Sequence, residues 1–403
     1  MLYYLREMLS SIRRNLDYLS IYLGLTVIDL DDSNIQLRVP PEIHINPPLL
    51  NSANPWATTL EDLKALFECP STGAVTTRTA LLDGFPHDPG SHQYTFFNPA
   101  TNIPGGRVST RQSATPEEGA NASLNNMGYS PIKLDEYLGY IKEISDSLPE
   151  PSEKWFIVSV TGSPDDVATC YKRVCRLQAK VKMPLALELN LSCPNIVGAP
   201  PPAYDAKALE KYLNVLWAGS GMMRTGAEEE EGEEVVVGAR RVPWGIKTPP
   251  YTHAGQFDML VKALRGVAAP RFKEACPVSF VTATNTLGSC LVLSDDDGDS
   301  LDEKGRPRLA GSGVGGMAGA PLHPLALGNV ATLRRMLDEH RETRHVRIIG
   351  VGGVEDAMGY RRMRGVGAAA VGVGTALGRK GVAVFKEIEG GLGGPEGDGK
   401  VGW

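Results

Sequence analysis

The sequence has few features that would tie it to a metal, a membrane or a nucleic acid. Its six cysteines include no CxxC pair, so we expect neither a zinc site nor a disulfide framework, and a reducing compartment fits best. The net charge of −6 argues against a nucleic-acid or membrane-surface partner. The N-terminal region has no signal-peptide pattern, and its longest uncharged run, residues 18–28, is too short to cross a bilayer. We therefore expect a cytoplasmic protein without a bound metal.

The size and composition are those of a globular enzyme. The chain has 403 residues, of which 42% are hydrophobic and 7% aromatic. This length exceeds the usual single domain, but α/β barrels with insertions often reach it. We expect an N-terminal extension over residues 1–44 and one catalytic domain over residues 45–403.

From about residue 47 the chain alternates short β-favouring runs with stretches of helical periodicity. The expected strands are 47–53, 74–78, 156–161, 185–191, 244–248, 278–284, 347–351 and 369–373. The expected helices are 59–68, 134–147, 164–181, 206–217, 256–267, 324–340, 355–364 and 381–388. This alternation predicts an α/β fold, a (β/α)8 TIM barrel with loop insertions, and the alternative is a doubly wound sheet.

Two polar segments interrupt the alternation. Residues 219–241 contain the acidic run Glu228–Glu234, which is typical of a mobile, solvated loop. Residues 293–313 are also rich in acids, but the acids do not fall on the positions of a calcium loop. We interpret the second segment as a polar hairpin or excursion.

Polar residues collect where the expected strands end. Asn190 and Cys193 follow the fourth strand, Lys247 ends the fifth and Asn285 follows the sixth. The carboxyl ends of barrel strands form the active-site face. A lysine at the end of an apolar strand is costly unless it faces an anion or an electron-rich ring. We interpret these residues as functional; the alternatives are a structural cysteine and a surface lysine.

Glycines follow the last two expected strands. Gly352 and Gly353 follow residues 347–351, and Gly374 with Thr375 follows residues 369–373. Glycines at these positions let backbone N–H groups approach a phosphate closely. The alternative interpretation is that the glycines only allow tight turns. We predict that the cofactor is flavin mononucleotide (FMN), because one face of the barrel would carry a thiol, carboxamides, a lysine and a phosphate cradle. The lysine would stabilise negative charge on the reduced flavin, and the thiol would move a proton.

Several motifs resemble those of class 1A dihydroorotate dehydrogenases. Asn190-Leu-Ser-Cys193-Pro-Asn195 is similar to the catalytic loop of that family, and further similarity lies at 245–251, 285–288, 315–320, 352–353 and 374–377. The similarity extends over roughly residues 45–388. It implies a flavin-bearing barrel that forms a homodimer and oxidises dihydroorotate to orotate in pyrimidine biosynthesis. The electrons would pass to fumarate and yield succinate.

The resemblance also implies a role for each matching residue. Cys193 would be the base that removes a C5 proton while C6 delivers hydride to the flavin. Substrate contacts would come from Arg78, Asn125, Met127, Gly128, Tyr129, Asn190, Asn195, Asn285 and Thr286. FMN contacts would come from Ser52, Thr79, Asn190, Lys247, Thr284, Gly319, Gly352, Gly353, Gly374 and Thr375.

The sequence departs from the family pattern in three places. Arg78 stands where the family has lysine, and Asn51-Ser-Ala-Asn-Pro55 replaces an Ala-Ser-Gly pattern. The run Met127-Gly128-Tyr129-Ser130 lacks the usual Leu-Pro-Asn ending, which reshapes a lid over the substrate. These departures leave two alternatives: an FMN-dependent oxidoreductase of another dihydropyrimidine, and a catalytically silent barrel with a binding role.

Overall fold

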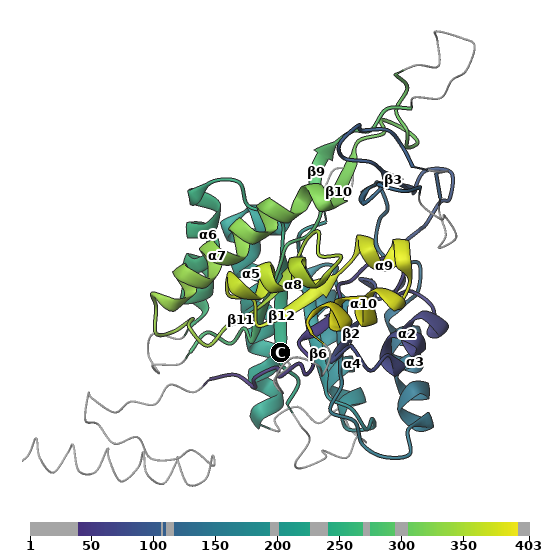
Figure 1. The fold of residues 1–403 in the computed structure, drawn as a ribbon. Coiled ribbons are helices and arrows are strands. Elements are labelled where there is room, and N and C mark those ends of the chain that lie inside the picture. The colour runs from purple at the N-terminus through teal and green to yellow at the C-terminus, as the bar shows by residue number, and fades with distance from the viewer. Residues whose placement is uncertain are drawn as a thin grey trace, which may run out of the picture.

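The computed structural model describes residues 39–105, 108–109, 117–193, 201–225, 241–268, 275–294 and 305–393. Eight strands of this part of the chain are β1 (Leu49–Asn51), β2 (Ala74–Thr76), β5 (Trp155–Val160), β6 (Leu185–Asn190), β7 (Trp244–Thr248), β8 (Phe280–Ala283), β11 (Arg347–Val351) and β12 (Ala370–Val373). They pair in parallel as a closed barrel in the order β1-β12-β11-β8-β7-β6-β5-β2 (Figure 1). All eight predicted strands are confirmed. Closure excludes the doubly wound sheet, because β1 pairs with both β12 and β2.

Helices connect these strands and cover the outside of the barrel (Figure 1). They are α2 (Leu60–Glu68), α3 (Leu134–Ser147), α4 (Pro164–Gln178), α5 (Ala206–Thr225), α6 (Ala254–Val267), α7 (His323–Asp338), α8 (Ala357–Gly365), α9 (Thr375–Lys380) and α10 (Ala383–Gly391). The eight predicted helices are confirmed in position. Helix α5, however, runs to Thr225, so residues 219–225, which were predicted to belong to the loop 219–241, are helical instead. The short helix α9 was missed; Gly381, with φ of +64°, ends it before α10 begins.

The strands place alternate residues on opposite sides of the barrel wall. Leu49, Phe156 and Ile348 belong to an apolar cluster that includes the inward faces of the helices. Their neighbours Leu50, Ile157 and Ile349 belong to a second cluster that contains no helical residue and fills the barrel interior. This period of two, with both faces buried, explains why the strands appear in the sequence as continuous apolar runs.

A second, antiparallel sheet stands at one end of the barrel and was not predicted (Figure 1). Its strands are β3 (Tyr94–Phe97), β4 (Ala122–Asn125), β9 (Leu287–Cys290) and β10 (Gly315–Gly319), in the order β3-β4-β10-β9. Residues 315–319 form a central strand of this sheet, although no strand was predicted there. The glycines serve close approach between strands, since a Cβ on Gly315 would lie 2.2 Å from the Asn125 carbonyl oxygen.

The two polar segments are described only in part. At the ends of the second segment, the Ser294 amide donates to the Arg306 carbonyl at 2.8 Å, and Leu293 pairs with Pro307 in antiparallel fashion. Residues 295–304, residues 226–240 of the acidic segment and residues 1–38 of the extension lie outside the described ranges. No helix in the described part of the chain combines the length and apolar character that a membrane span requires.

Lys154 ties the end of α2 to the amino-terminal end of β5. Its ammonium donates to the Phe67 and Cys69 carbonyls at 2.7 and 2.6 Å and to the Thr72 hydroxyl at 3.2 Å. Two carbonyls at the helix end, which lack an intrahelical donor, thereby gain a charged one.

Replacing Lys154 with Met keeps the apolar stem and removes that donor. We expect the free energy of unfolding to fall by about 2 kcal/mol, because the carbonyl of the buried Phe67 loses its charged donor. Urea unfolding measures the change. Lys142→Met is the control, since Lys142 pairs with Asp146 on an exposed face and should change stability by less than about 0.5 kcal/mol. Equal losses in both variants would contradict the role given to Lys154.

Candidate active site

A cavity of about 990 Å³, including its opening, lies where the barrel strands end. Its walls are formed by residues that follow the barrel strands β1, β2, β6, β8, β11 and β12 and by a residue of β7. Residues of β4 and β10, from the second sheet, complete them. The carboxyl ends of the strands thus form one side and the second sheet the other. In barrel enzymes this end carries the chemistry.

Every predicted site residue in the described part of the chain lines this cavity. They are Ser52, Arg78, Thr79, Asn125, Met127, Gly128, Tyr129, Asn190, Cys193, Lys247, Thr284, Asn285, Thr286, Gly319, Gly352, Gly353, Gly374 and Thr375. Asn195 lies outside the described residues. The structure brings these residues together, whereas their individual roles stay predictions.

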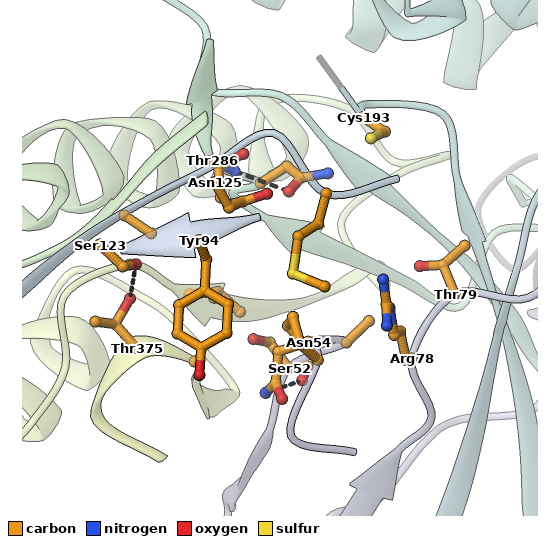
Figure 2. Close-up of a pocket in the computed structure, with 18 of the residues that line it drawn as sticks. Ser52, Asn54, Arg78, Thr79, Tyr94, Ser123, Asn125, Cys193, Thr286 and Thr375 are labelled. Atoms are coloured by element: carbon orange, nitrogen blue, oxygen red, sulfur yellow. Dashed lines mark hydrogen bonds between the residues drawn. The ribbon is translucent and has the colours of Figure 1, made fainter. Parts of the chain in front are cut away.

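Sequence analysis missed Asn54, Trp56, Tyr94 and Ser123, which also line the cavity. Tyr94 and Ser123 belong to the unpredicted second sheet, so the fold gave no reason to select them. The aromatic run at residues 94–97 is the one signal that could have indicated a strand there. Figure 2 shows Ser123 and Thr375 on one side of the cavity, and Cys193, Thr79 and Arg78 on the other.

Carboxamides near Cys193 are held by a buried network of hydrogen bonds. The Asn190 Nδ2 donates to the Thr79 hydroxyl at 2.9 Å, and that hydroxyl also contacts Ser159 Oγ at 3.0 Å. The Asn190 Oδ1 accepts from Ser192 Oγ at 3.0 Å and from Asn285 Nδ2 at 3.3 Å. The amide groups are therefore oriented before any ligand arrives, as recognition of a planar polar molecule requires.

Lys247 places a buried positive charge at the same end. Only 3% of the residue is exposed, and burial lowers its pKa, while the charges of Glu188 and Cys193 act in the opposite direction. No described residue forms a hydrogen bond or contact ion pair with its ammonium. Glu188 is engaged elsewhere, accepting from Ser159 at 2.9 Å and from Thr282 at 2.6 Å. A buried ammonium in this setting is suited to an anionic or electron-rich ligand.

Arg78 is the second buried cation. Its Nη2 donates to the Gly128 and Tyr129 carbonyls at 3.1 and 3.0 Å, and burial lowers its pKa. Both Arg78 and Lys247 interact electrostatically with Cys193. Two positive charges therefore favour the thiolate form of Cys193, which is the reactive form of a cysteine.

Glycines and hydroxyls form the opposite end of the cavity. Gly319, Gly352 and Gly353 have φ of +87°, +142° and +66°, and a Cβ on Gly353 would lie 2.6 Å from the Gly319 carbonyl oxygen. Ser123 Oγ and Thr375 Oγ1 contact each other at 2.9 Å beside them. Such a cradle of backbone and hydroxyl donors, without a side chain to fill it, fits a phosphate group.

The fold is a (β/α)8 barrel, and the site is a cavity at the carboxyl ends of its strands, with a glycine cradle that would suit a phosphate group. A family model described as dihydroorotate dehydrogenase matches residues 107–394. The dihydroorotate dehydrogenase (fumarate) of Trypanosoma cruzi is 30% identical over 360 residues, which cover 88% of this chain and 91% of that protein. The chain therefore belongs to the dihydroorotate dehydrogenase family, whose members are oxidoreductases.

Two further comparisons agree with this membership. Dihydroorotate dehydrogenase A (fumarate) of Lactococcus lactis is 28% identical over 266 residues, covering 66% of this chain and 71% of that protein. The crystal structure of ligand-free DHODH from Eimeria tenella has a TM-score of 0.58 at 16% identity, covering 87% of this chain and 86% of that one. At that identity the second comparison shows the shared fold.

Replacing a glycine of the cradle by alanine should change the stability of the protein in the opposite direction from replacing a glycine inside a helix. Gly319→Ala should destabilise the protein by more than about 1 kcal/mol, because its φ is positive and the new Cβ would lie 2.3 Å from the Asn121 carbonyl oxygen. Gly328→Ala, inside helix α7 with open space around it, should instead stabilise by about 0.5–1 kcal/mol. Urea unfolding of both variants tests this, and equal effects would exclude a required glycine at position 319.

Proposed function

We propose that the chain is an FMN-dependent dihydroorotate dehydrogenase, which forms orotate and passes the electrons to fumarate. The proposal depends chiefly on one observation: Cys193, the carboxamides, Lys247 and the glycine cradle line a single cavity. The printed activity of the Trypanosoma cruzi relative, dihydroorotate dehydrogenase (fumarate), supports fumarate as the acceptor. By the resemblance to class 1A enzymes, we also infer a cytoplasmic homodimer.

The cavity residues fit FMN at both ends. The cradle of Gly319, Gly352, Gly353 and Gly374 offers donors for the phosphate, with Thr375 beside it. At the other end, no described residue forms a hydrogen bond or a contact ion pair with the Lys247 ammonium. It could therefore contact an electron-rich edge of the flavin ring. The buried Thr284 hydroxyl, which also faces the cavity, has no hydrogen-bond partner in the described part of the chain. When bound, FMN supplies an acceptor for the hydride that leaves the substrate.

The carboxamides would bind and orient the substrate. Asn125 is aimed from β4 by a hydrogen bond from its Nδ2 to the Gly316 carbonyl at 3.2 Å. Asn190 and Asn285 are aimed by the network described above. Three oriented amides around a planar ring can distinguish its carbonyl, amide and carboxylate groups.

Cys193 would remove the proton. Its thiolate Sγ would accept the C5 proton of dihydroorotate while the positive charges of Arg78 and Lys247 stabilise the anionic form before transfer. Asn190 and Asn285 would hold the substrate in place during this step. Positioning of this kind lowers the barrier by fixing the reacting atoms in contact.

A visible spectrum tests the proposal directly. The purified protein should show a flavin band that bleaches on anaerobic addition of dihydroorotate and returns on addition of fumarate. Cys193→Ala should keep the band and bleach about 10²- to 10⁴-fold more slowly, the usual contribution of a general base. Cys290→Ala is the matched control, because Cys290 lies on β9 and does not line the cavity. An alanine variant at Cys193 with unchanged rate would exclude Cys193 as the base.

One observation favours a second candidate function. Arg78 donates to two lid carbonyls, so its guanidinium is not fully free for a substrate carboxylate. A dihydropyrimidine without a carboxylate, such as dihydrouracil, would suit that arrangement. Bleaching by dihydrouracil but not by dihydroorotate would favour this alternative, and a protein that binds no FMN would exclude both functions.

A further inference from the structure

The turn after β11 presents a pair of glycines to the phosphate end of the cavity. Gly352 and Gly353 both line the cavity, and no described residue accepts a hydrogen bond from the Gly353 amide. A peptide between two glycines is the one whose rotation the backbone itself hinders least. If this peptide turned over, the Gly352 carbonyl oxygen would replace the Gly353 N–H, and a phosphate would meet an acceptor instead of a donor. The orientation of this one peptide therefore decides whether the turn attracts or repels an anion.

His323, the first residue of α7, holds the carbonyl side of that peptide. Its ring Nδ1 lies 2.7 Å from the Gly352 carbonyl oxygen, and only 8% of the residue is exposed. A Cβ on Gly353 would lie 2.7 Å from the His323 Cβ, so the turn packs directly on this residue. His323 does not itself line the cavity. Because the peptide is trans, its N–H points away from its carbonyl and hence away from His323.

Arg362 of α8 fixes which ring nitrogen of His323 carries the proton. Its Nε donates to the His323 Nε2 at 3.1 Å. A guanidinium has donors only, so Nε2 is the accepting nitrogen and the ring proton lies on Nδ1. Nδ1 therefore donates to the Gly352 carbonyl. Because the guanidinium is charged, its hydrogen bond also polarises the ring and strengthens the donation from Nδ1.

We propose that His323 is a positioning residue for the phosphate of the cofactor: it holds the Gly352–Gly353 peptide with the Gly353 N–H turned toward the cradle. The role rests on the proposed function, in which the cradle holds the phosphate of FMN. His323 acts on the phosphate only through this peptide. A side chain behind the cradle thus gives the cradle its polarity.

A comparison of FMN with riboflavin, the same flavin without the phosphate, separates this role from a general loosening of the site. The full-length protein is loaded with either flavin and diluted, and the fluorescence of the released flavin gives each Kd. The ratio of the riboflavin Kd to the FMN Kd measures the contribution of the phosphate. His323→Leu should lower this ratio about tenfold, because the hydrogen bond that orients the cradle is lost.

His323→Asn tests whether the donor, and not the ring, is what matters. The asparagine amide can donate from nearly the position of Nδ1, so the ratio should stay within about twofold of the wild-type value. A fall as large as that of His323→Leu would overturn the proposal, since the effect would then come from packing of the ring.

His345→Leu is the matched control. The His345 Nε2 lies 2.8 Å from the Cys276 carbonyl oxygen, before β11 begins, and His345 does not line the cavity. The variant removes the same kind of contact away from the cradle, so the ratio should equal that of the wild type. An unchanged ratio in His323→Leu, or an equal fall in both leucine variants, would overturn the proposal.

Arg362→Met decides the question if His323→Leu does not fold. Arg362 is exposed, and methionine keeps much of its stem while removing the donor that fixes the ring proton. The ratio should fall about threefold, because the proton is then shared between the two ring nitrogens. Arg361→Met is its control, since Arg361 donates to the Leu392 carbonyl at 3.0 Å and should leave the ratio unchanged. No fall in Arg362→Met would overturn the proposal.

Flavin bleaching by dihydroorotate is read separately on the wild type. A lowered ratio in His323→Leu, with a wild type that dihydroorotate does not bleach, would reject the dehydrogenase and keep the positioning role. Bleaching with an unchanged ratio would reject the positioning role alone. A wild type that binds FMN no more tightly than riboflavin would also reject the positioning role, and one that binds neither flavin would reject both.

Discussion

The Lys247 ammonium is buried at the carboxyl end of the barrel with no contact partner among the described residues. Moving such a charge out of water costs several kcal/mol, and attraction from Glu188 offsets only part of that cost. Glu188 is itself held by the hydroxyls of Ser159 and Thr282, so its charge stays where it is. An anionic or electron-rich ligand in the cavity would supply further compensation. The amides, the thiol and the glycines line the same cavity and surround the place where it would bind.

Closure of the barrel turns distant sequence positions into neighbours around that charge. Asn190 of β6 pairs with Lys247 of β7, which in turn pairs with Thr282 of β8. These pairings are fixed because a slip of one residue would move every interior side chain to the helical side. At Gly245 the neighbouring β8 approaches so closely that a Cβ would lie 2.4 Å from the Phe280 carbonyl oxygen. The geometry of the site is thus a property of the strand register.

The barrel was predictable because its strands are continuous apolar runs separated by helical periodicity. The rim residues were predictable because Cys193, Lys247 and Asn285 end such runs. The second sheet was not, since β10 is largely glycine and β4 has four residues without a clear alternation. Tyr94 and Ser123 were missed with it. The contacts of Arg78 also could not be predicted, because they depend on where the lid backbone lies after folding.

The antiparallel pairing at the base of the 295–304 segment has an evolutionary consequence. Beyond β9 and before β10 the chain stays paired at the Leu293–Pro307 bridge, and the Ser294 amide donates to the Arg306 carbonyl at 2.8 Å. Asn125 lies on β4, which β10 separates from β9, and its side chain is held by the Gly316 carbonyl of β10. Its position therefore does not depend on the residues that connect Ser294 to Arg306. The cost of closing a longer loop grows only slowly with its length. Lineages could therefore lengthen, shorten or replace this connection, or use it to carry a new recognition element, without disturbing the site where the substrate would bind.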